Sequence, residues 1–167
     1  MEKKAELIKK AEQLAFEYEQ NYGGCAQCTL AAIKDTLGKV NSEVIKSATG
    51  LAGGVGFLGS TCGALTGGVL ALSLWKGREY GNLDDPEKVR LYSCILARRL
   101  GEKFIQEYGS VLCKDIQYQL LGRSYDLSDE KEMQDFIQDG GRTDKCPSVC
   151  SKSAGWVVEI LAEESLE

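Results

Sequence analysis

Hydrophobic residues recur every three or four positions along most of the chain, which is the spacing of one buried face of an α-helix. These stripes predict helices over about residues 3–20, 25–37, 42–53, 60–75, 86–108, 110–121, 128–138 and 146–163. Alternating hydrophobic and polar positions, the pattern of a half-buried β-strand, are missing. We therefore expect an all-α fold in which residues 1–167 form a single domain. It would be a bundle of about seven to eight helices with a glycine-rich loop between the third and fourth.

An uncharged stretch between Lys46 and Lys76 raises the question of a membrane span. The Gly53-Gly54 pair and further glycines interrupt it, and its longest apolar run is far shorter than the roughly 20 residues that a spanning helix needs. We expect a buried pair of helices here and no membrane insertion.

The same stretch contains GxGxxG at residues 54–59. This motif indicates a nucleotide site only where it follows a β-strand, and the preceding segment is predicted to be helical. Close helix packing explains the glycines better, because Gly59, Gly63 and Gly67 are spaced by four and would leave a smooth groove on one helix face.

Composition and charge exclude several classes of function. The chain has seven cysteines and no histidine, which excludes Ser–His–Asp and Cys–His hydrolases, HExxH metallopeptidases and histidine-ligated haem. A net charge of −5 without a concentrated basic face argues against nucleic acid as a partner. The N-terminus leads directly into an amphipathic pattern without the apolar core of a signal peptide, so we expect a cytoplasmic protein. In a reducing compartment, cysteines indicate metal ligation or redox chemistry.

Four cysteines fall at the start of four different predicted helices: Cys25, Cys62, Cys113 and Cys146. Unpaired N–H groups and the positive end of the helix dipole favour an anion at that position. A thiol there is expected to ionise more easily, and the thiolate is both the nucleophile and the metal ligand. The pattern therefore favours one shared site, although four separate core positions are the alternative.

The roles of the other three cysteines are less clearly indicated by the sequence. Cys28 forms a CxxC with Cys25, and Cys150 forms a CxxxC with Cys146, so either pair could form a disulfide or supply two metal ligands. Cys28 and Cys150 are thus possible additional ligands, or small buried hydrophobes. For Cys94 we favour the buried, purely structural interpretation.

At these residues the chain resembles the family of redox-active proteins named C_GCAxxG_C_C for its cysteine pattern. The resemblance rests on Cys25, on the CGAxxG run from Cys62 to Gly67, on Cys113, and on Cys146 before Pro147. The family name has the letters in the order GCAxxG, whereas this chain contains CGAxxG. The resemblance implies a helical redox-active domain whose site consists of Cys25, Cys62, Cys113 and Cys146. A related domain occurs in split-Soret cytochromes, but this chain lacks the CxxCH that attaches haem.

Three functions remain open. Four thiolates could hold an iron–sulfur cluster for electron transfer, with Gly63 and Gly67 allowing close backbone approach. Alternatively, the cysteines could perform metal-free thiol–disulfide chemistry as an oxidoreductase or redox sensor. A structural Cys₄ zinc site is the third possibility. We expect a redox partner protein that the sequence does not identify, and the small-residue face could also serve a homodimer.

Overall fold

The computed structural model describes residues 2–164 and confirms the all-α prediction. These residues form eight α-helices: α1 (Glu2–Tyr22), α2 (Cys25–Leu37), α3 (Ser42–Ser47), α4 (Gly63–Lys76), α5 (Val89–Tyr108), α6 (Cys113–Leu121), α7 (Glu130–Gln138) and α8 (Cys146–Glu163). Two 3₁₀ turns, η1 (Thr49–Leu51) and η2 (Tyr80–Asn82), and a π-helical turn, η3 (Gly141–Lys145), lie between them. The expected glycine-rich loop is present between α3 and α4.

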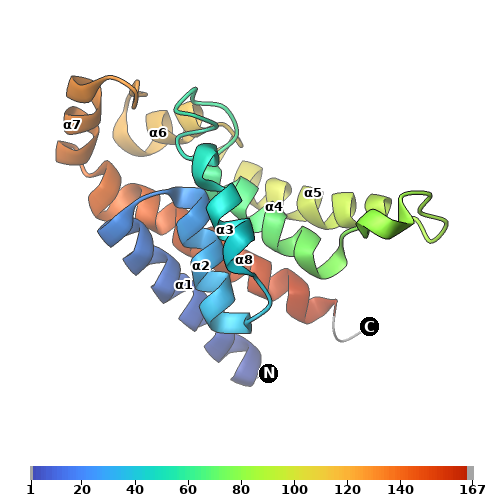
Figure 1. The fold of residues 1–167 in the computed structure, drawn as a ribbon. Helices are drawn as coiled ribbons and strands as arrows, with labels where there is room; N and C mark the ends of the chain where they lie inside the picture. The colour runs from blue at the N-terminus through green and yellow to red at the C-terminus, as the bar shows by residue number, and fades with distance from the viewer. Residues whose placement is uncertain (1, 165–167) are drawn as a thin grey trace.

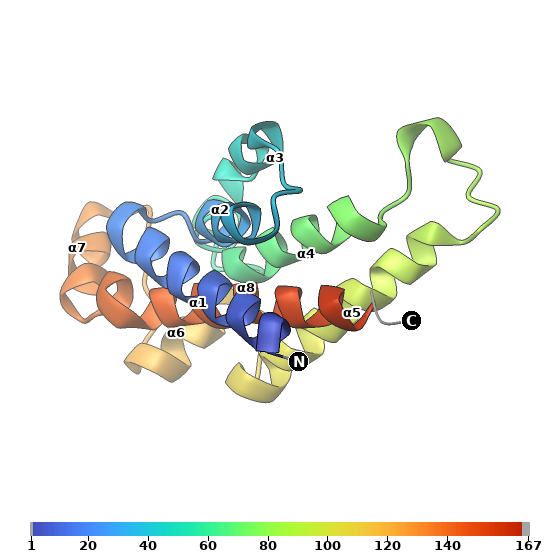
Figure 2. The ribbon, with the colours of Figure 1, turned by 90° about the horizontal axis from the view of Figure 1, so that it is seen from below.

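Helix α8 is the centre of the bundle, because α1, α2, α4 and α5 all pack against it (Figure 1, Figure 2). Ser153 of α8 is fully buried, and its hydroxyl donates a hydrogen bond of 2.7 Å to the Ala64 carbonyl of α4. Most of its other inward side chains are hydrophobic: Val149, Val157, Val158, Ile160 and Leu161. Because α8 carries so much of the core, its first turn is held firmly in place.

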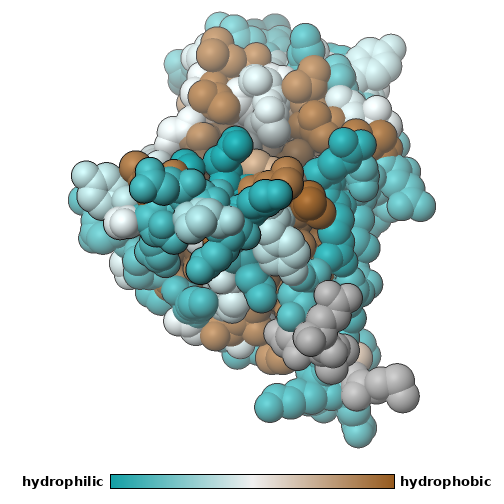
Figure 3. All heavy atoms as spheres, turned by 90° about the vertical axis from the view of Figure 1, so that its right-hand side faces the viewer, coloured by the Kyte–Doolittle hydropathy of each residue, from teal (hydrophilic) through white to brown (hydrophobic). Residues whose placement is uncertain are grey.

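The two ends of the molecule differ in character. Helices α6 and α7 lie at one end, and the connection between α4 and α5 lies at the other (Figure 1). The latter end exposes hydrophobic side chains among charged ones (Figure 3), and Leu83, Leu91 and Ile95 are each 47–55% exposed. We assign no occupant to this face, and the expected homodimer stays a prediction.

Helices α2 and α4 approach each other at the level of their backbones. At Gly67, a Cβ atom would lie 2.5 Å from the carbonyl oxygen of Ala26, and at Gly63 it would overlap the sulfur of Cys25. These two glycines therefore form the packing groove predicted from the sequence. Gly59, by contrast, lies in the loop before α4, and its backbone is left-handed with a φ of +70°.

Three helices, α4, α5 and α6, begin three residues later than predicted. Helix α4 starts after Ser60 and Thr61, and α6 after Leu112, because Thr61 pairs with Leu112 in an isolated antiparallel bridge. Helix α5 starts three residues after Pro86, because Asp85 acts as a cap from a distance. Its carboxylate accepts hydrogen bonds from the N–H groups of Val89 and Arg90, at 2.7 and 3.0 Å.

The uncharged stretch over residues 47–75 divides into the end of α3, η1, the glycine-rich loop and most of α4. Within residues 2–164, no helix combines the length and the apolar composition needed to cross a membrane.

The close approach of α2 and α4 can be tested with two alanine substitutions. Gly67→Ala would force the helices apart and should lower the free energy of unfolding by about 1–3 kcal/mol. Gly101→Ala, in α5 where a Cβ meets nothing within 4 Å, should instead raise it by up to about 1 kcal/mol through helix propensity. Urea unfolding of both variants measures the difference. Equal stabilities would contradict the proposed packing role of Gly67.

Candidate functional site

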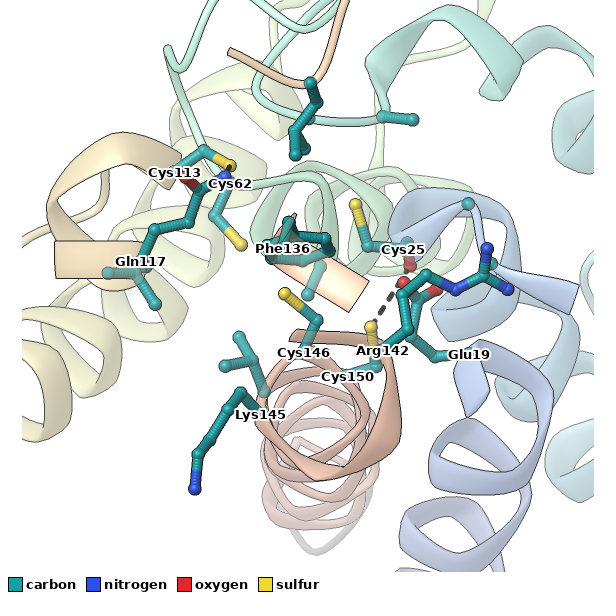
Figure 4. A pocket seen from close by; sticks show the side chains of 18 of the residues that line it. Glu19, Cys25, Cys62, Cys113, Gln117, Phe136, Arg142, Lys145, Cys146 and Cys150 are labelled. Carbon is teal, nitrogen blue, oxygen red and sulfur yellow. Dashed lines mark hydrogen bonds between the residues drawn. The ribbon is translucent and has the colours of Figure 1, made fainter. Parts of the chain in front are cut away.

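A cavity of about 330 Å³ lies where the beginnings of four helices come together. Cys25, Cys113 and Cys146 are the first residues of α2, α6 and α8, and Cys62 immediately precedes α4. All four line the cavity, together with Cys150 one turn further along α8. Figure 4 shows the sulfurs distributed around a common space. The structure thus brings together all four cysteines predicted to share a site.

The bridge between Thr61 and Leu112 positions two of these cysteines. Cys62 donates its N–H to the Val111 carbonyl at 2.9 Å, and Cys113 donates to the Ser60 carbonyl at 2.6 Å. Because side chains alternate along extended chain, the residues that follow the bridging pair point to the same face. Figure 4 shows Cys62 and Cys113 on the same side of the cavity.

The opposite wall is formed by α2 and α8. Gly23 and Gly24, both left-handed with φ of 70° and 93°, turn the chain from α1 into α2 and leave Cys25 at the first position. Cys146 follows the π-helical turn η3, and Cys150 lies close enough to donate its S–H to the Cys25 carbonyl at 3.7 Å. A fifth sulfur therefore joins the four expected ones.

Burial dominates the acidity of these thiols. It raises the pKa of all five cavity cysteines above the ordinary value of 9.0, and that of Cys25 to about 12. Backbone N–H groups of Gly53 and Ala26 lower the pKa of Cys25, and two N–H groups at the start of α4 lower that of Cys62, but less than burial raises them. The expectation that these helix starts ease ionisation is therefore wrong, because loss of solvation outweighs the favourable helix ends.

Two further cysteines lie elsewhere. Cys28 is buried in α2, where its S–H donates to the Gly23 carbonyl at 3.1 Å, and its side chain is not part of the cavity wall. Cys94 is exposed on α5, so its interpretation as a buried hydrophobe is wrong. The buried face of α5 contains Ser93, the residue before Cys94, together with Leu96.

Gly63 and Gly67 do not line the cavity either. They face α2, where they permit the close helix packing described above. Their role in positioning Cys25 is structural, and their expected approach to a bound group stays a prediction.

The cavity is also lined by a buried glutamate, Glu19, which was not predicted from the sequence. Glu19 is only 5% exposed, and burial raises its pKa from 4.5 to about 7, although a hydrogen bond with Cys28 and the charge of Arg142 oppose this. The helical spacing of the sequence could have indicated its burial. Glu19 lies four residues after Ala15, which lies four after Ala11, and all three form the buried face of α1.

Three buried side-chain atoms have no hydrogen-bond partner among the described residues: Glu19 Oε2, Arg142 Nε and Tyr108 OH. Glu19 and Arg142 line the cavity. Burial and then Glu107 raise the pKa of Tyr108, and the cavity cysteines Cys62, Cys150 and Cys146 contribute less, which places this hydroxyl in their neighbourhood. Unpaired buried polar atoms are rare in folded proteins, so their concentration around one cavity indicates a site that accommodates something polar.

The sulfurs surround the cavity without converging on one point. Across residues 2–164, no three thiol or carboxylate groups lie in an arrangement that could hold a single metal ion. A tetrahedral zinc site of the Cys₄ type is therefore not preformed, because its four sulfurs must all lie about 2.3 Å from one atom. In an iron–sulfur cluster, by contrast, different cysteines bind different irons, so its sulfurs are spread around a larger group.

Comparison with known proteins agrees with this arrangement. A family model described as "Putative redox-active protein (C_GCAxxG_C_C)" matches residues 23–160, which include every cavity cysteine. The chain belongs to this C_GCAxxG_C_C family. The matched residues contain the four cysteines on which the resemblance rests and also Cys150, the fifth cavity sulfur.

One relative of the chain is an uncharacterised protein from Archaeoglobus fulgidus. The two are 29% identical over 117 residues, which cover 66% of this chain and 76% of the relative. No solved structure matches the chain.

The buried Glu19 carboxyl makes stability depend on pH. Its pKa is higher in the folded protein than in the unfolded chain, so its contribution is fully present below pH 4.5 and is lost as pH rises through about 7. The loss should be about 3 kcal/mol. Urea unfolding of the metal-free protein at pH 5 and pH 8 measures it, and Glu19→Gln should lack this part of the decline. Parallel pH profiles of the two proteins would refute the assignment.

Proposed function

We propose that the protein is an iron–sulfur electron carrier whose cluster binds in the cysteine-lined cavity. Cys25, Cys62, Cys113 and Cys146 would be the ligands. The observation that carries this proposal is the meeting of four sulfurs, each from the beginning of a different helix, around one cavity of about 330 Å³. Membership of a redox-active family supports the same chemistry.

The residues around the cavity fit such a group. Thiols are the usual ligands of iron–sulfur clusters, and the cavity walls supply four together with a fifth at Cys150. Backbone N–H groups already point at two of the sulfurs, from Gly53 and Ala26 to Cys25 and from the first turn of α4 to Cys62. The unpartnered hydroxyl of Tyr108 adds a buried donor near three of the sulfurs.

When bound, a cluster would supply transfer of single electrons at a buried position. The chain's own residues would set the conditions for that transfer. Donated N–H···S hydrogen bonds stabilise negative charge on sulfur and thereby raise the reduction potential, while burial excludes water. Cys25 and Cys62 are the residues through which the backbone acts most directly.

The raised pKa values favour this proposal over metal-free thiol–disulfide chemistry. Attack on a disulfide or peroxide requires a thiolate that is accessible to solvent and populated near neutral pH. Burial raises the pKa of the Cys25 thiol to about 12 and that of Cys146 well above 9.0, so both are neutral without a metal. Iron would reverse this, because coordination removes the thiol proton.

A cytoplasmic location and a separate redox partner protein are part of the proposal. Reduced, unpaired thiols persist where glutathione and thioredoxin keep them reduced, which is the environment that cluster assembly on this set of cysteines needs.

Anaerobic purification followed by absorbance, iron and acid-labile sulfide analysis tests the proposal. We expect brown protein that dithionite bleaches. Cys62→Ser and Cys113→Ser should each lose most of the iron and colour, because each removes one ligand. Cys94→Ser is the matched control, since Cys94 is exposed on α5 and should keep both.

Two results would overturn the proposal. Colourless, iron-free wild-type protein whose thiols pair stepwise on mild oxidation would favour thiol–disulfide chemistry. Zinc bound stoichiometrically without sulfide, and lost together with stability on chelation, would favour the structural alternative.

A further inference from the structure

The cavity extends beyond its sulfurs to an apolar wall. Helices α6 and α7 and the segment between them contribute hydrophobic side chains there: Leu120, Leu121, Leu127, Met133 and Phe136. None of these carries a thiolate, a carboxylate or an imidazole, which are the usual ligands of iron and zinc. The volume of about 330 Å³ covers both the region among the sulfurs and the region along this wall. A concave, mainly apolar pocket with a few polar groups is the usual form of a small-molecule site.

Among the polar side chains that line this pocket, Glu19 and Arg142 have buried atoms without a partner. The Oε2 atom of Glu19 and the Nε atom of Arg142 are both buried and have no partner in the described structure. The two side chains lie on the same side of the cavity (Figure 4), and Arg142 is close enough to lower the pKa of Glu19. They nevertheless form no ion pair with each other among the described residues. Space for a third polar group is therefore left at this corner.

Contacts on the other side hold Arg142 in this position. Its guanidinium lies over Gly23, where a Cβ atom would come within 2.7 Å of Arg142 Cζ. Lys145, the neighbouring cation, has a partner and does not point at the sulfurs. Lys145 is paired with Asp144 at 2.9 Å, and Figure 4 shows it pointing away from the sulfurs. Arg142 is thus the cation of the cavity wall with donor capacity to spare.

We propose that the cavity binds a small organic acid, whose carboxylate accepts a hydrogen bond from Arg142 beside Glu19 and whose apolar body lies against Met133 and Phe136. This site goes beyond the proposed electron-carrier function and does not depend on which redox group the cysteines hold.

A single carboxylate suits this corner better than other anions. Arginine pairs well with carboxylates, and Glu19, whose burial makes the neutral acid accessible at neutral pH, can share its proton with a second carboxyl. A phosphate ester carries about two charges, and only one unpaired cation is present to balance them beside a carboxyl group. The bound acid would supply partners for both Arg142 Nε and Glu19 Oε2, which otherwise remain buried without any.

Binding of benzoate and of hexanoate to the anaerobically purified protein tests the site, by calorimetry or by ligand-observed NMR. Both acids should bind, and benzyl alcohol, which lacks the charge, should bind at least about tenfold more weakly. Arg142→Gln should weaken benzoate binding by a similar factor. Lys145→Gln is the matched control, because it removes the same charge three residues further along the chain and should change binding less than twofold. Glu19→Gln, which keeps a donor, should not weaken it.

Failure to bind either acid would overturn the inference and indicate that water fills the corner. Equal losses in Arg142→Gln and Lys145→Gln would overturn it as well, since they would show a nonspecific effect of net charge. Iron content measured on the same samples separates the two proposals. Iron without acid binding refutes only this site, whereas acid binding without iron refutes only the proposed cluster.

Discussion

The contact between the backbones of α2 and α4 is the constraint on which the site depends. Without side chains at Gly63 and Gly67, the first turn of α2 lies directly against the first turn of α4. Cys25 and Cys62 precede or begin these turns, so the same contact that packs the core also brings two sulfurs to one cavity. A larger residue at either glycine would separate the helices and the sulfurs together. Stability and site geometry therefore cannot vary independently in this part of the fold.

Helix ends and burial act on the thiols in opposite directions, and burial has the larger effect. The beginnings of α2 and α4 direct N–H groups toward Cys25 and Cys62, yet burial keeps the pKa of both thiols raised, so they remain neutral. The N–H groups thus offset part of the free-energy cost of placing negative charge in this buried cavity. A redox centre that gains and loses electrons is one kind of group that supplies such charge.

The sequence predicted the parts of the site that local chemistry determines. The helix starts predicted at Cys25 and Cys146 were correct, and most helices were found from their periodicity. The starts of α4, α5 and α6 were predicted too early. A bridge between residues some fifty positions apart decides where α4 and α6 begin, and the Asp85 cap decides where α5 begins. Cys94 was misplaced because Ser93, next to it, occupies the buried face of α5. Arg142 could not have been identified, since its place against Gly23 depends on how η3 packs on the corner between α1 and α2.

The central position of α8 has a consequence for how the protein matures. This last helix supplies both the middle of the core and the Cys146 wall of the cavity, while Cys25 comes near the beginning of the chain. During synthesis, the earlier helices leave the ribosome with no central helix to pack around, and their cavity lacks one side. Contacts between residues so far apart in sequence form late in folding. A group that needs the Cys146 wall can therefore be enclosed only once α8 has been synthesised and packed, at a stage when the other three cysteines are already present in the chain.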